Sequence, residues 1–120
     1  MYVDEKTCSL GFAGDVPCGC YARFMRAVPD DLIDGAARAA DISKSLGGDE
    51  PELCILISCV GRKAVLKQLT EEETESVQES YGNKPVMTGF YSYGEIAPFR
   101  PGERAMLHNQ TMTITTISED

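Results

Sequence analysis

The longest apolar run of the chain is Leu53-Cys-Ile-Leu-Ile-Ser-Cys-Val60, which only Ser58 interrupts. A near-continuous run of this length, rich in leucine and isoleucine, is typical of a strand that is covered on both faces. A turn with a proline and acidic residues, Asp49-Glu-Pro-Glu52, comes directly before it. The run therefore predicts the central strand of a sheet with other layers packed against it.

A helix is predicted before this strand in the sequence. The acidic pair Asp30-Asp31 follows Pro29 and suits the positive end of a helix dipole. Apolar residues then recur at helical spacing, the pattern ends near Leu46, and Gly47-Gly48 provides the stop signal. The members of this apolar stripe are Leu32, Ile33, Ala36, Ala37 and Ala40.

Two further helical segments are predicted after the strand. Residues 61–68 are typical of a short helix. Thr70-Glu-Glu-Glu73 matches the capping box, in which a threonine and a glutamate three residues later cap the first turn, so a new helix is expected from there to about Tyr81. Gly82 with Asn83 is its stop signal. We interpret the acidic start of this helix as capping rather than as a metal site.

The outer parts of the chain contain extended candidates. Residues 8–17 and 21–28 suggest an opening hairpin around a turn rich in glycine, aspartate and proline. Residues 86–93 form an aromatic-rich strand, and a turn region at 94–102 leads to a last strand at about 105–118.

Together these elements occur in the order β-β-α-β-α-α-β-β. The strand-helix-strand units require right-handed crossovers, and the strand pairs at the two ends can be antiparallel. The sequence therefore predicts one α/β domain over residues 1–120, a mixed sheet of about five strands with two or three helices packed against it. An unbroken alternating register in the last strand places His108 on the same face as Met112 and Ile114.

Composition excludes several classes of protein. The 120 residues carry a formal net charge of -8, and their eleven basic residues are too scattered for a nucleic-acid or anionic-membrane surface. No apolar run approaches the roughly 20 residues of a membrane-spanning helix, and the start lacks the apolar region of a signal peptide. The five cysteines form no regular framework, which indicates reduced thiols and a cytoplasmic location.

Two arrangements of thiols offer chemistry. Cys59-Val-Gly-Arg62 lies where the central strand enters a helix, where backbone N–H groups can bind an anion or lower a thiol pKa. No base adjoins it, so Arg62 is either a ligand contact or a member of an ion pair, and Cys59 is the less favoured candidate for a catalytic nucleophile. Cys18-Gly-Cys20 with His108 lacks the paired knuckles of a zinc site, so neither a metal nor a cofactor is expected.

The stretch Gly89-Phe-Tyr-Ser-Tyr-Gly-Glu95 places three aromatic rings, a hydroxyl and a carboxylate around two glycines. Pockets for small polar ligands need this mixture of ring walls, orienting polar groups and close backbone approach. A core strand followed by a turn explains the same residues. The residues alone favour this second interpretation, because Phe90 is needed in the core.

Several segments, in this order, resemble the C-terminal portion of FIST domains. They are Gly11-Phe-Ala-Gly-Asp-Val-Pro17, Leu32-Ile-Asp-Gly-Ala-Ala37, Ser58-Cys-Val-Gly-Arg62, Leu69-Thr-Glu-Glu-Glu73, Thr88-Gly-Phe-Tyr-Ser-Tyr-Gly-Glu-Ile-Ala-Pro98 and Leu107-His-Asn-Gln-Thr-Met112. The resemblance implies an intracellular bacterial sensory domain that binds small ligands, with amino acids as one class, and acts with histidine kinases, chemotaxis proteins or similar output modules. A complete FIST domain also has an N-terminal portion, which we do not expect in this chain.

The resemblance also selects candidate ligand-binding residues. On this basis we assign Arg62 to an anionic group of the ligand and Glu95 to an amino group, with Phe90 and Tyr91 as pocket walls. Sheets of α/β proteins tend to bind ligands at strand ends and turns, where these residues lie. The full set adds hydrogen-bonding and backbone positions and comprises Arg62, Gly89, Phe90, Tyr91, Ser92, Gly94, Glu95, His108 and Asn109.

Three classes of function follow. A non-catalytic small-molecule sensor is favoured, because polar and aromatic groups cluster without a nucleophile paired to a base. A protein-interaction or oligomerisation module is the alternative, since sensory domains commonly act as dimers and an isolated half-domain exposes an apolar face. A homodimer is then an expected partner. A thiol-dependent enzyme using Cys59 is the third class.

Overall fold

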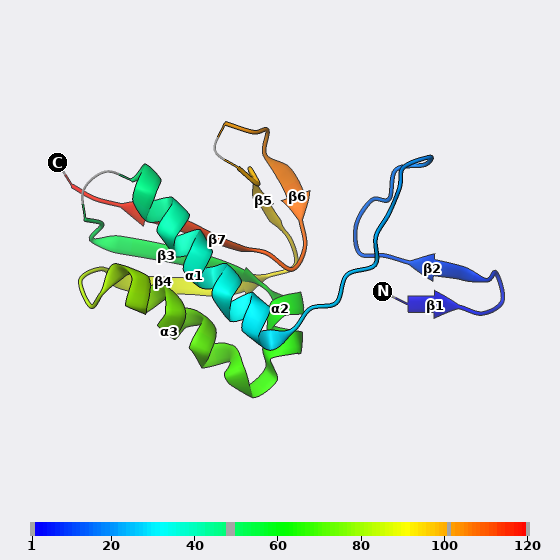
Figure 1. Cartoon of the computed structure of the whole chain (residues 1–120), viewed down its shortest axis with the longest axis horizontal. Coiled ribbons are helices and arrows are strands. Elements are labelled where there is room, and N and C mark those ends of the chain that lie inside the picture. The colour runs from blue at the N-terminus through cyan, green and yellow to red at the C-terminus, as the bar shows by residue number, and fades with distance from the viewer. Residues whose placement is uncertain (1, 48–49, 101, 120) are drawn as a thin grey trace.

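The computed structural model describes residues 2–47, 50–100 and 102–119 and has the expected α/β architecture. Helices lie on one side of a three-stranded sheet, and two hairpins stand apart from it (Figure 1). The seven short strands of the described residues therefore form three sheets, where about five strands in one sheet were expected. Gly48 of the predicted helix stop signal and Asp49 of the predicted turn before the central strand lie outside the described residues.

The central sheet is built around β3 (Leu53–Cys59). β4 (Val86–Ser92) pairs with it in parallel on one side, and β7 (Met112–Ile117) pairs in antiparallel orientation on the other. In this register Leu56 lies between Gly89 and Ile114. The prediction of a central strand in a mixed sheet is confirmed.

The predicted helices all form. They are α1 (Pro29–Leu46), α2 (Val60–Leu66), the short 3-10 helix η1 (Lys67–Leu69) and α3 (Thr70–Tyr81). The segment from α2 through α3 is the crossover that makes β3 and β4 parallel. α1 and α3 lie next to each other over the same face of the sheet (Figure 1).

The core lies between this helix layer and the sheet. Even-numbered residues of β3 face the helices, because successive side chains of a strand point to opposite faces. The stripe of small side chains on α1 lets the helix approach the sheet closely, while α3 contributes larger groups. The buried cluster comprises Ala36, Ala40, Cys54, Leu56, Val77 and Tyr81, with Met87, Met112 and Ile114 packed against it.

The opposite face of the sheet carries no helix among the described residues (Figure 1). Leu53, Ile55 and Ile57 of β3 point to this side and are only half-buried, and most of their neighbours on the two edge strands are exposed. The expectation that β3 is covered on both faces is therefore wrong for the described chain. We call this surface the open sheet face, and its apolar members are Leu53, Ile55, Ile57, Val86, Phe90 and Ile117.

The opening hairpin differs from the predicted one. It pairs β1 (Tyr2–Asp4) with β2 (Ser9–Gly11), and the Asp4 carboxylate accepts hydrogen bonds from two backbone N–H groups of the turn. Residues 21–28, predicted as the second strand, have no regular structure until the helix begins, so the hairpin of residues 8–17 with 21–28 is wrong. The turn at Asp4 forms because the aspartate side chain hydrogen-bonds to backbone N–H groups only two and three residues away.

The predicted last strand is divided in two. β6 (Met106–His108) pairs with β5 (Glu95–Ala97), a strand that lies within the predicted turn region. Gln110 follows with φ of 62°, a left-handed conformation that breaks the strand before β7. The alternating register does not continue through this residue. His108 therefore lies opposite Glu95, and its predicted place on the face of Met112 and Ile114 is wrong.

α3 begins at Thr70 as predicted, but the capping box does not form. The residue at the N-cap is Leu69, and no side chain caps the helix. The Thr70 hydroxyl donates instead to the carbonyl oxygen of Lys67. Glu73 is completely buried, and its carboxylate pairs with Arg62 instead of the backbone N–H groups of the first turn.

Residues 2–28 form an arm that extends away from the helices and the central sheet (Figure 1). We call this segment the N-terminal arm. Asn109 donates a hydrogen bond to the carbonyl oxygen of Ala13 at 3.0 Å, which links the arm to the rest of the chain. The molecule is correspondingly long, with principal extents of 57 × 34 × 19 Å. Within the described residues, no helix is both long enough and apolar enough to cross a membrane.

Gly89 is predicted to be required for the pairing of β3 with β4. A Cβ atom at this position would overlap the backbone carbonyl of Leu56 on the neighbouring strand. We expect Gly89→Ala to lower the free energy of unfolding by about 1–3 kcal/mol, as for other overpacked sites. Urea unfolding measures this loss. Thr88→Val, an exposed β-branched exchange on the same strand, is the control, and equal stability of the two variants would contradict the prediction.

Candidate functional site

Polar side chains gather at the carboxyl ends of the two parallel strands. Because β3 and β4 run in the same direction, Cys59 and Ser92 end side by side. Ligands of α/β sheets bind at this kind of edge. Two hydrogen-bonded networks occupy it, one around Glu73 on the helix side and one around Glu95.

The first network is centred on the carboxylate of Glu73. Its Oε1 atom accepts a hydrogen bond from Nε of Arg62 at 2.5 Å, within an ion pair whose two side chains are almost inaccessible to solvent. The Ser58 hydroxyl lies 3.0 Å from Oε2, and the Tyr91 hydroxyl lies 3.4 Å from the same atom. Most acceptor positions of this buried carboxylate are thus used within the protein.

The two terminal nitrogens of the Arg62 guanidinium face backbone carbonyl oxygens. Its Nη2 donates to the Leu32 carbonyl oxygen at 2.7 Å, and its Nη1 lies 3.5 Å from the Gln110 carbonyl oxygen. Of the two interpretations that the sequence left open for Arg62, the structure places it in an ion pair. A guanidinium so placed holds α1, α3 and the β6–β7 connection together and is not presented to solvent.

The second network surrounds Glu95, which is also buried. Its carboxylate accepts hydrogen bonds from the hydroxyl of Ser92 and, at 2.7 Å, from the hydroxyl of Thr111. His108, opposite Glu95 in the hairpin, has its Nε2 atom 3.0 Å from the Ala97 carbonyl oxygen. These contacts join the end of β4 to the start of β7.

A groove runs between α3 and β4 on the helix side, and we call it the α3–β4 groove. It has a volume of about 420 Å³. Burial raises the pKa of the Tyr91 hydroxyl and the nearby Glu73 carboxylate raises it further, so Tyr91 stays a protonated donor at neutral pH. Lys63 lies at the same end, with Nζ 4.9 Å from the centre of the Tyr91 ring. The lining residues are Leu56, Ser58, Glu73, Thr74, Gln78, Met87, Thr88, Gly89, Phe90, Tyr91 and Met112.

The structure does not bring the nine candidate residues into one pocket. Gly89, Phe90 and Tyr91 line the α3–β4 groove, although the Phe90 side chain is 62% exposed and belongs to the open sheet face. The others lie elsewhere. Arg62 is in the buried ion pair, Ser92 and Glu95 are in the second network, His108 and Asn109 contact backbone carbonyls, and Gly94 lies against the Leu107 side chain.

Sequence reasoning missed the groove residues of α3. One signal was available, because Glu73, Val77 and Tyr81 are spaced by four residues and so share one face of the helix. That face is buried, and it carries Glu73 into the domain. The exposed groove residues Thr74 and Gln78 gave no comparable signal, since polar side chains on a helix surface are ordinary.

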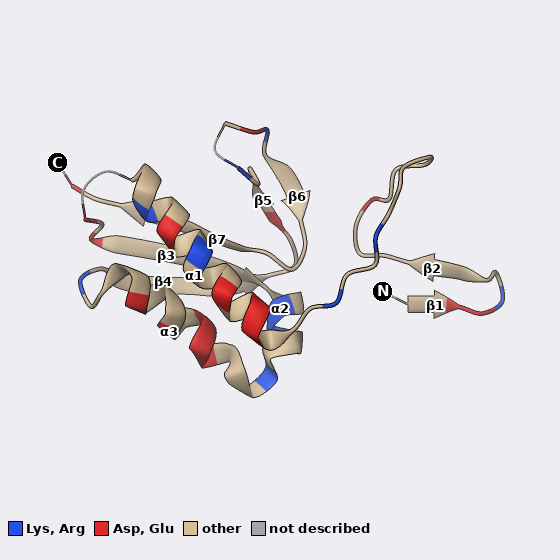
Figure 2. Ribbon diagram, viewed as in Figure 1, with Lys and Arg blue, Asp and Glu red and all other residues tan. Residues whose placement is uncertain are grey.

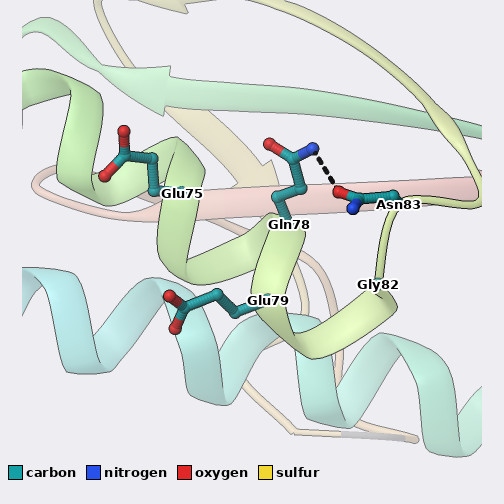
Figure 3. Close-up of a pocket in the computed structure, with 5 residues that line it drawn as sticks. All are labelled: Glu75, Gln78, Glu79, Gly82 and Asn83. Carbon is teal, nitrogen blue, oxygen red and sulfur yellow. Dashed lines mark hydrogen bonds between the residues drawn. The ribbon is translucent and has the colours of Figure 1, made fainter.

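A second depression of about 360 Å³ lies at the carboxyl end of α3 (Figure 3). Gln78 donates to Asn83 there at 2.9 Å, while the carboxylates of Glu75 and Glu79 point in different directions. The described residues contain no group of three or more histidine, cysteine, aspartate or glutamate side chains that could hold a metal ion. The depression is therefore a solvated part of the helix surface.

The fold and its groove define a small α/β domain with a preformed concave site beside the edge strand of its sheet. The chain matches the family model of the FIST C domain over residues 1–98, and it belongs to this family of sensory and signal-transduction domains. The matched range includes both buried carboxylates and ends before β6 and β7. No curated protein and no solved structure matched the chain.

The Arg62–Glu73 pair yields a prediction about stability. Removing one partner leaves a buried unpaired charge, so Arg62→Met and Glu73→Leu should each cost about 3–5 kcal/mol of unfolding free energy. The double variant should lose less than the sum of the two, because it removes both charges together. Urea unfolding of the four proteins measures the coupling. Glu72→Gln, exposed on the same helix, is the control, and additive losses would contradict the ion pair.

Proposed function

We propose that this chain is a non-catalytic small-molecule-sensing domain of a signal-transduction protein, and that its ligand binds in the α3–β4 groove. The observation that carries the proposal is the composition of the groove, which combines a buried carboxylate, a protonated tyrosine hydroxyl and the bare backbone of Gly89. Its volume falls within the range of about 300–1,000 Å³ that is typical of small-molecule sites.

The groove chemistry favours a small polar metabolite with an anionic group, and amino acids are one such class. Lys63 at the rim is an exposed cation for a carboxylate, in place of Arg62, which is buried in its ion pair. The Gln78 amide donates to Asn83, which leaves its carbonyl oxygen to accept from a ligand amino group. Met87 and Met112 supply an adaptable apolar floor.

A ligand in this groove would contact two elements that the first network joins. Tyr91 on β4 donates toward Glu73 on α3, and Glu73 binds Arg62 on α2. A ligand that competes for the Tyr91 hydroxyl would favour one arrangement of these elements over another, and such differential binding is what a sensory domain requires. An output module, such as a histidine kinase or a chemotaxis protein in the bacterial cytoplasm, would respond to that change.

The non-catalytic assignment is supported by the state of Cys59. Its thiol belongs to a residue that is only 3% exposed, and the Nε2 atom of His108 contacts a backbone carbonyl. A nucleophilic thiol needs exposure and a base or cation beside it. A thiol-dependent reaction at Cys59 is therefore disfavoured.

A ligand screen tests the groove. Thermal unfolding with a panel of amino acids and other small metabolites should reveal a compound that raises the melting temperature, because ligand at about 100 times its Kd adds roughly 2.7 kcal/mol. Thr74→Trp places a bulky side chain at the exposed groove wall and should abolish that shift. Glu72→Trp, on the same helix outside the groove, should keep it. A shift that survives Thr74→Trp would place the ligand elsewhere, and the absence of any shift would count against the sensor.

Thiol alkylation tests the non-catalytic assignment. In the folded protein, iodoacetamide should modify the exposed Cys8, Cys18 and Cys20 and spare the buried Cys54 and Cys59. Burial also raises the pKa of the Cys54 thiol, which lowers the fraction of reactive thiolate there and adds to its protection from iodoacetamide. Mass spectrometry counts the adducts, and urea should expose all five sites. Preferential alkylation of Cys59 at neutral pH would overturn the assignment.

A further inference from the structure

The chain exposes more surface than a compact protein of its size. Its accessible surface is 9213 Å², whereas a compact monomer of this mass exposes about 6,400 Å². Its radius of gyration is 16.3 Å, against about 14 Å for a compact chain of this length. An excess of about 2,800 Å² per chain exceeds the roughly 800 Å² that each partner buries in a standard interface.

The N-terminal arm supplies much of this surface. Nearly all of its described residues are exposed, including several with large apolar side chains. A segment with so many apolar groups gains free energy when another surface covers them, at roughly 25 cal/mol per Å². The exposed apolar residues of the arm are Tyr2, Val3, Leu10, Phe12, Val16, Tyr21, Phe24 and Met25.

The open sheet face is the matching surface on the body of the molecule. Its centre is formed by isoleucine and leucine side chains of β3, and Val86 and Phe90 on β4 are 68% and 62% exposed. Thr88 and Phe90 at the β4 edge also line the α3–β4 groove. The rest of this face is separate from the groove, because both helices lie on the other side of the sheet. A partner on the open sheet face would therefore leave most of the groove free.

Charge favours contact between an arm and a body over contact between two bodies. The three acidic and three basic residues of the arm cancel, so the remainder of the chain carries the full formal charge of -8. Figure 2 shows acidic residues along α1 and α3, on the helix side of the sheet. Residues 21–28 carry Arg23 and Arg26 without any acid, between exposed aromatic and apolar side chains. This part of the arm can approach an acidic body without repulsion.

The geometry of the chain directs the arm away from its own open sheet face. The arm joins α1 at Val28, and α1 covers the opposite side of the sheet (Figure 1). The hydrogen bond from Asn109 to Ala13 holds the arm beyond the end of the sheet. The arm therefore does not cover the open sheet face of its own chain. In a pair of copies related by a two-fold axis, each arm can instead reach the open sheet face of the other copy.

We propose that the chain forms a two-fold homodimer in which the N-terminal arm of each copy covers the open sheet face of the other. Two arms and two faces together offer an interface at the upper end of the range of about 2,000–5,000 Å² found for obligate homodimers. Such a reciprocal exchange is self-complementary and closes at two copies.

Light scattering at micromolar concentration tests the dimer, with variants that separate its two surfaces. The wild-type chain should have twice the chain mass. Phe24→Asp in the arm and Phe90→Asp on the open sheet face should each give the mass of a single chain. Ile42→Asp, at an exposed apolar position of α1, should remain a dimer.

Circular dichroism verifies that each variant keeps its helices, and Thr88→Lys replaces Phe90→Asp if that variant fails to fold. A single-chain mass for the wild type would overturn the proposal. So would a dimer that survives Phe24→Asp but not Phe90→Asp, since that result means direct pairing of two sheet faces. Dissociation by Ile42→Asp would place the interface on the helix side and would also overturn it.

Discussion

The buried guanidinium of Arg62 is the constraint on which the arrangement of the helices depends. It meets Glu73 of α3, the Leu32 carbonyl oxygen in α1 and the Gln110 carbonyl oxygen before β7. Such a charge is tolerated inside a domain only when its hydrogen bonds are satisfied. Ser58 and Tyr91 complete the set of donors to the carboxylate. The position of α2 is therefore determined by polar contacts as much as by apolar packing, and the groove beside α3 takes its shape from the same network.

The elements themselves could be predicted from the sequence because their signals are local. The apolar run at β3, the helical stripe of α1 and the start of α3 each depend on residues within one element. What covers each face of β3 depends on the whole chain. An apolar run predicts that both faces of a strand are covered, but it does not tell whether the second layer comes from the same chain or from another. The prediction of a capping box was wrong for a related reason. The Glu73 carboxylate accepts a hydrogen bond from Arg62, eleven residues away in the sequence, rather than from a backbone N–H group of its own helix.

The roles of single side chains in the candidate site also depend on contacts between distant parts of the chain. The motif from Gly89 to Glu95 lies at the carboxyl end of β4 and continues into the start of β5. Alternation along the strand sends Tyr91 to the groove and Phe90 to the open sheet face, so neighbours in sequence serve different surfaces. Arg62 was selected for its charge, but its partner eleven residues away in α3 determines what that charge does. Register and burial, which no single motif encodes, decide these roles.

The position of β7 has a consequence for how the chain is made. This strand pairs with β3, from which it is separated by two α-helices, a 3-10 helix and three strands, and it brings Met112 and Ile114 to the core. During synthesis, the helices and β4 are complete well before residues 112–117 leave the ribosome. Until then β3 has a bare edge and the core lacks one wall. Folding of the central sheet is accordingly a late, long-range event, and the nascent domain exposes a strand edge that a chaperone or another chain can engage.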